Sequence, residues 1–92
     1  MRILHLQAET KGEFFVEQNG TKIAFMSYTK NNDTRIIIDH TEVHESQKGT
    51  GLGKKLVFEA VAFAREKGIK ILPLCPFARA VFLRNKDIQD VT

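Results

Sequence analysis

The chain has 92 residues, enough for one hydrophobic core and too few for two, so we expect a single domain over residues 1–92. No apolar run approaches the roughly 20 residues that cross a bilayer, and residues 1–5 lack the stretch of a signal peptide, so we expect no membrane association. The net charge is +3, but the basic residues are scattered, which disfavours binding to nucleic acid. The single cysteine fits a cytoplasmic protein.

The first elements along the chain are predicted to form a β-hairpin. Residues 13–18 predict a strand with Phe14 and Val16 on one face and Phe15 and Glu17 on the other. Asn19 and Gly20 form a strong signal for a two-residue hairpin turn. Residues 21–30 then continue as the second strand.

A third strand is predicted after a turn at residues 30–33. It covers Arg35 to Val43 and contains three consecutive isoleucines, at positions 36–38. Consecutive β-branched residues indicate burial on both faces, so this strand should be central in the sheet. The first half of the chain therefore predicts an antiparallel meander.

The apolar period changes from two to about 3.6 after residue 51. The pattern predicts a helix over residues 52–67, ended by Gly68, followed by a short strand over residues 69–74. Strand 35–43, the helix and strand 69–74 form one β-α-β unit, so the two strands should be parallel.

A last helix is predicted over residues 76–85, because Pro76 suits the first turn of a helix. Residues 86–92 show no clear pattern. The predicted fold class is therefore α+β (mixed α/β): a mostly antiparallel sheet with one parallel strand pair, and helices packed on it.

The segment between strand 35–43 and helix 52–67 carries the strongest functional signal. Its three glycines, Gly49, Gly51 and Gly53, alternate with other residues immediately before the helix. Glycines let the backbone approach an anion closely, and the helix N-terminus adds the positive end of its dipole. This order favours a phosphate-binding loop, although such a loop can also simply turn a strand into a helix.

The motif resembles the acetyl-CoA motif of the GNAT superfamily of N-acetyltransferases. Lys48 occupies a position that is usually Arg or Gln, and Gly51 and Gly53 match the two motif glycines. After the following strand, the family commonly has Asn-x-x-Ala-x-x-x-Tyr, and here the same spacing reads Cys75, Ala78 and Phe82.

The resemblance implies a GNAT-like fold, acetyl-CoA as co-substrate, no metal, and an amine as the acetyl acceptor. It also implies that the strand ending at Val43 separates from its neighbour and pairs through its backbone with the pantetheine arm. The residues that it assigns to the cofactor are Val43, His44, Lys48, Gly49, Thr50, Gly51, Leu52, Gly53, Lys54, Cys75, Ala78 and Phe82.

The chain also departs from the family pattern. The helices usually found between the first two strands are missing, because Asn19 and Gly20 close that connection directly. The strands after the last helix are missing too. The half that binds the donor is thus retained, and the half that commonly shapes the acceptor pocket is reduced.

Two residues are candidates for the chemistry at the thioester. Cys75 precedes Pro76 and is expected to cap the last helix, where the helix dipole favours a thiolate; it could then carry the acetyl group as a thioester. It could equally be a small buried hydrophobe. Phe82 stands where many GNAT enzymes carry a proton-donating Tyr, and phenylalanine cannot donate a proton.

His40 is the candidate general base, because an imidazole titrates near neutrality. It should lie on the strand face opposite Thr41 and Val43, with Glu42 as a weaker candidate on its own face. A histidine bonded to a neighbouring carbonyl is the alternative. The chain offers no zinc-ligand spacing.

Three functions remain open. The first is an N-acetyltransferase that acts on an exposed amine, on a small molecule or on a protein. The second is a module that binds acetyl-CoA or coenzyme A without efficient turnover, which the missing Tyr and the reduced acceptor half favour. The third, a more distant option, is a nucleic-acid or protein adaptor that uses the basic surface. A monomer or weak dimer is expected.

Overall fold

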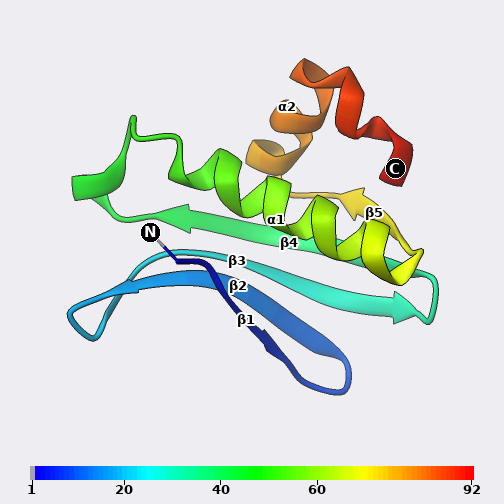
Figure 1. Ribbon diagram of the computed structural model, residues 1–92, viewed down its shortest axis with the longest axis horizontal. Helices are drawn as coiled ribbons and strands as arrows, with labels where there is room; N and C mark the ends of the chain where they lie inside the picture. Colours follow the sequence, from blue (N-terminus) through cyan, green and yellow to red (C-terminus); the bar gives the residue numbers. More distant parts are fainter. Residues whose placement is uncertain (1) are drawn as a thin grey trace.

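The computed structural model describes residues 2–92. One five-stranded sheet has the strand order β1-β2-β3-β4-β5, so neighbours in sequence are also neighbours in space (Figure 1). The strands are β1 (Leu4–Gln7), β2 (Lys11–Gln18), β3 (Thr21–Asn32), β4 (Arg35–Val43) and β5 (Lys70–Pro73). The first four are antiparallel, and β5 is parallel to β4. The predicted α+β class and the parallel pair are confirmed.

Two α-helices follow β4 and β5. Helix α1 (Leu52–Lys67) has the predicted bounds, and Gly68 ends it in the left-handed region at φ 68°. Helix α2 (Pro76–Arg84) starts at the proline, because its missing N–H costs no hydrogen bond in the first turn. A short 3-10 helix (Glu45–Gln47) lies between β4 and α1.

The hydrophobic core lies on one face of the sheet, between the strands and the helices. Alternate strand residues, such as Ile36 and Ile38, join side chains of both α-helices in one buried cluster. Ile37 points to the other face and is only half-buried. The prediction of burial on both faces is therefore wrong for Ile37, since no helix packs on that side within residues 2–92.

Strand β1 was not predicted, because four residues are too short for a periodic signal. A side-chain cluster fastens it to the sheet. The His5 ring stacks on Phe14 at a centroid distance of 4.0 Å, and its Nε2 lies 2.6 Å from the Tyr28 hydroxyl. Gly12 leaves room for Tyr28, since a Cβ at that position would come within 2.2 Å of the hydroxyl oxygen.

The C-terminal tail, which shows no clear sequence pattern, forms a second 3-10 helix (Lys86–Val91). Ile88 and Val91 are buried in the core. Arg65 of α1 holds this segment with a bidentate pair to Asp90, through Nε at 3.1 Å and Nη2 at 2.7 Å. The sequence pattern did not reveal this 3-10 helix, because it depends on how its two buried apolar residues pack against α1 and α2.

Candidate functional site

The site begins where β4 and β5 separate. The two strands pair only from Arg35 opposite Lys70 to Ile38 opposite Pro73. The backbone N–H groups of Leu74 and Cys75 both donate to the Ile38 carbonyl, at 3.0 and 3.1 Å, as the chain turns away. Within residues 2–92, residues 39–43 of β4 therefore continue with no strand on that side.

The backbone of Thr41 and Val43 faces the resulting gap. The His44 N–H donates to the Ile23 carbonyl at 2.7 Å, on the β3 side. Hydrogen-bonding residues alternate along an antiparallel strand, so Glu42 also bonds toward β3. The N–H and C=O groups of Thr41 and Val43 consequently point away from β3, where an extended molecule could pair with them.

A β-bulge at Asp39 sets which side chains face the helices. Tyr28 is opposite Ile38 and Ser27 is opposite His40, so Asp39 is an extra residue in β4. Its carboxylate accepts hydrogen bonds from Ser27 Oγ at 2.5 Å and Thr29 Oγ1 at 2.9 Å. The bulge turns Thr41 toward the helices and His40 toward the open face.

The glycine loop supplies unpaired backbone donors. Gly49 and Gly51 adopt φ values of 84° and 81°, which side-chain-bearing residues rarely tolerate. Gly51 caps α1 without a side-chain hydrogen bond. Within residues 2–92, the N–H groups of Leu52, Gly53 and Lys54 have no hydrogen-bond acceptor, whereas that of Lys55 bonds to Gly51. Such a helix start suits an anion.

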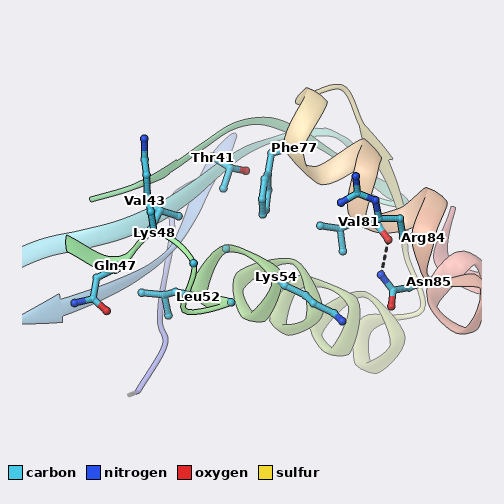
Figure 2. Close-up of a pocket in the computed structure, with 13 residues that line it drawn as sticks. Thr41, Val43, Gln47, Lys48, Leu52, Lys54, Phe77, Val81, Arg84 and Asn85 are labelled. Atoms are coloured by element: carbon cyan, nitrogen blue, oxygen red, sulfur yellow. Dashed lines mark hydrogen bonds between the residues drawn. The ribbon is translucent and has the colours of Figure 1, made fainter. Parts of the chain in front are cut away.

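A cavity of about 700 Å³ joins the gap to the loop and to α2 (Figure 2). Among the described residues, its walls contain three cationic side chains and no carboxylate. The lining residues are Thr41, Val43, Gln47, Lys48, Gly49, Gly51, Leu52, Gly53, Lys54, Phe77, Val81, Arg84 and Asn85. The cavity therefore combines backbone donors and positive charge at a helix start, with an open strand edge beside them.

Seven residues that the resemblance assigned to the cofactor line this cavity, namely Val43, Lys48, Gly49, Gly51, Leu52, Gly53 and Lys54. His44 and Thr50 do not line it and instead shape the loop. His44 Nδ1 accepts from the Ser46 N–H at 3.1 Å, and the Thr50 hydroxyl donates to the Gln47 carbonyl at 2.6 Å. Their assignment to the cofactor stays a prediction.

Cys75 lies directly behind the cavity wall. It is 5% exposed and precedes α2 as its N-cap. Its Sγ lies 3.4 Å from Oγ1 of Thr41, which lines the cavity. Burial raises the pKa of the thiol, but hydrogen bonds from the Thr41 hydroxyl and from the N–H groups of Ala78 and Phe77 outweigh it, so the pKa is lowered.

Ala78 and Phe82 lie in the core and do not line the cavity. The α2 wall is formed instead by Phe77, Val81 and Arg84, which share a helix face at spacings of four and three residues. The sequence pattern predicted these three residues only as part of a helix. Their role in the cavity wall depends on how α2 packs beside α1, which the pattern of a single helix does not reveal.

Gly53 is required for that packing. A Cβ at Gly53 would come within 2.6 Å of Cζ in the Phe77 ring. A side chain at this position would therefore clash with Phe77. At Gly51, a Cβ meets nothing within 4 Å, so the positive φ alone disfavours other residues.

The structure does not bring His40 together with Cys75. His40 lies on the open face, with its Nε2 3.3 Å from Glu42 Oε2 and its ring 5.6 Å from that of Phe25. Its side chain is 60% exposed. Cys75 and the cavity lie on the helix side of the same strand segment. The role of His40 as a base stays a prediction.

Comparison with known proteins identifies the family. The sequence profile of the GCN5-related N-acetyl-transferase family matches residues 13–91. A GCN5-like candidate N-acetyltransferase from Staphylococcus aureus, solved by NMR, is 34% identical, with a TM-score of 0.75, 98% of this chain covered and 85% of that one. No protein of curated function matches the sequence significantly.

More distant solved structures share the fold. Ribosomal-protein-alanine N-acetyltransferase from Brucella melitensis is 18% identical, with a TM-score of 0.68 over 84% of this chain and 62% of that one. The ribosomal-protein-S18-alanine enzyme from Escherichia coli is 20% identical, with a TM-score of 0.69 over 85% and 53%. This chain thus spans little more than half the length of these two enzymes.

Within residues 2–92, no helix is long and apolar enough to cross a membrane.

Proposed function

Because the chain belongs to the GCN5-related N-acetyl-transferase family, we propose that it binds acetyl-CoA and transfers the acetyl group to an amine. The observation that carries this proposal is the carboxylate-free cavity, which connects unpaired N–H donors at the α1 N-terminus with the open edge of β4. A coenzyme A thioester needs donors for its phosphates and room for an extended arm, and the α1 N–H groups beside the β4 edge support a ligand of this kind.

The loop would hold the pyrophosphate of the donor. The N–H groups of Leu52, Gly53 and Lys54 are available, and Lys48 adds a positive charge at the cavity wall. The pantetheine arm, which carries amides, would pair with the backbone of Thr41 and Val43. An aminoglycoside N-acetyltransferase of the same fold has been solved with CoA, which supports this class of ligand.

We propose a Cys75 thioester as one route for transfer. The thiolate would attack the acetyl carbonyl, a new C–S bond would form, and coenzyme A would leave as its thiolate and take up a proton. An unprotonated amine would then attack the enzyme thioester, form the amide and return the thiol. The lowered pKa of Cys75 and its place behind Thr41 support this route, which requires a reducing compartment such as the cytoplasm.

A direct attack by the amine is the alternative route. His40 and Glu42 lie on the other side of the β4 segment that borders the cavity, and an acceptor on that open face would meet them. The reduced acceptor half suits an exposed amine on a small molecule or a protein. A binding module without efficient turnover stays the second candidate, because Phe82 is buried in the core and offers no proton.

One assay separates these functions. Release of free coenzyme A from acetyl-CoA is measured across a panel of small and peptide-borne amines, together with calorimetric titration of coenzyme A. Amine-dependent release supports the enzyme, and binding without release supports the module. No heat of binding at millimolar coenzyme A would rule out both.

Mass spectrometry of the intact protein tests the thioester route. Incubation with acetyl-CoA should add one acetyl group that hydroxylamine removes at neutral pH, as a thioester requires. The adduct should disappear in Cys75→Ala, whose fold is checked by circular dichroism. An acetyl group that persists in Cys75→Ala would exclude Cys75 as its carrier.

A further inference from the structure

Binding of an anion at the glycine loop does not explain all the cationic side chains that line the cavity. Lys48 pairs with Glu45, with Nζ and Oε2 3.2 Å apart. Lys54 and Arg84 also line the cavity, and neither forms an ion pair within residues 2–92. The described walls of this cavity contain two unpaired cations and no carboxylate. They therefore attract more negative charge than a single anion at the glycine loop would carry.

Arg84 lies at the end of the cavity away from the start of the glycine loop. Figure 2 shows Gln47 and Lys48 at one end and Arg84 with Asn85 at the other. Arg84 is seven residues beyond Phe77 on α2, a rise of about 10 Å. An anion held by the loop donors is therefore a poor partner for this guanidinium.

A simpler role for Arg84 is to stabilise the C-terminus of α2, where cations interact favourably with the helix dipole. The direction of the side chain does not fit that role alone. Side chains on a helix point toward its N-terminus, and Figure 2 shows the guanidinium group beside Val81, on the cavity side. Asn85 Nδ2 donates to the Val81 carbonyl at 2.7 Å and caps the helix end.

We propose that Arg84 binds the 3′-phosphate of the coenzyme A donor, and so makes the protein select CoA thioesters over pantetheine thioesters that lack this group. The inference rests on the proposed function. With the pantetheine arm at β4 and the pyrophosphate at the loop, the adenosine part fills the remaining end of the cavity, between Lys54 and Arg84. A guanidinium group binds a phosphate through two parallel hydrogen bonds.

The test compares coenzyme A with 3′-dephospho-coenzyme A by calorimetry at fixed salt. The wild-type protein should bind coenzyme A about 10- to 100-fold more tightly, the range of a charge-assisted hydrogen-bonded pair. Arg84→Gln should abolish this preference by weakening coenzyme A alone. Arg84→Lys, which keeps the charge without the fork, should retain part of it.

Arg79 provides the matched control. It lies on the same helix and is exposed, but it does not line the cavity, so Arg79→Gln should leave both affinities unchanged. Equal affinities of the wild-type protein for the two ligands would overturn the role of Arg84, as would an equal loss of both in Arg84→Gln. Failure of the wild-type protein to bind either ligand would instead overturn the proposed function.

Discussion

The hydroxyl of Thr41 lies 3.4 Å from the sulfur of Cys75, and it belongs both to the wall of the cavity and to the surroundings of the thiol. A molecule that enters the gap beside β4 would therefore reach Thr41 before it reaches Cys75. The Thr41 side chain therefore stands between the cavity and the thiol.

Thr41→Val is expected to raise the pKa of Cys75. The hydrogen bond from Thr41 stabilises the thiolate, and valine has nearly the same shape without the hydroxyl. The ultraviolet absorbance of the thiolate, followed against pH, should shift its midpoint upward. Thr21→Val, at an exposed position in β3, is the control. A midpoint equal to that of the wild type would show that the hydroxyl does not tune the thiol.

Gly53→Ala is expected to disturb the packing of α1 against α2. The new methyl group would press on the Phe77 ring and should lower the free energy of unfolding by about 1–3 kcal/mol. Phe77→Leu should recover part of this loss in the double variant, but should not rescue Gly51→Ala, where φ is the obstacle. Urea unfolding measures each value, and strictly additive effects of Gly53 and Phe77 would contradict the contact.

Acidification should weaken the fold through His5. Burial and the nearby Lys30 lower the pKa of His5 below its usual 6.5, so the folded state favours the neutral ring. The unfolded chain binds a proton first as the pH falls below 6.5, and the stability due to the neutral ring is then lost. When the pH is lowered from about 7.5 to about 5.5, the melting temperature of His5→Gln should fall less steeply than that of the wild-type protein.

The exposed His40, replaced by glutamine, serves as the control for His5. His40→Gln should keep the pH dependence of the wild type, because this ring packs on the open face and has no part in fastening β1. If the wild type and His5→Gln lost stability in parallel on acidification, another group would be responsible.

Truncation of Ile88 should destabilise the protein more than loss of the nearby ion pair. Ile88→Ala removes a side chain that is 2% exposed and should lower the free energy of unfolding by about 2–5 kcal/mol. Asp90→Ala removes a solvent-exposed partner of Arg65 and should cost much less. Urea unfolding gives both values, and the reverse order would mean that the tail is held by charge and not by burial.

Local signals account for what the sequence predicted well. The bounds of α1 and β4 follow from period, glycine and β-branched residues, all read within a few positions. The anion loop follows from the spacing of Gly49, Gly51 and Gly53 in the same way. These features depend on the backbone preferences of the residues themselves, so they need no knowledge of the rest of the fold.

Features that depend on distant partners were missed. Strand β1 forms because His5 meets Phe14 of β2 and Tyr28 of β3, and the tail is ordered by contacts with α1. The α2 wall of the cavity, including Arg84, exists only because α2 packs beside the start of α1. None of these contacts leaves a periodic trace in the chain.

The bulge at Asp39 has a consequence for how this protein tolerates change. If Asp39 paired in a regular register instead, the alternation of the following strand would shift by one position, so Thr41 and His40 would exchange sides. Substitutions at residues 40–43 alter single contacts, whereas loss of the bulge from the full-length strand would move all of these side chains to the other face. The presence of the bulge is therefore under a stricter constraint than the identity of any one residue that follows it.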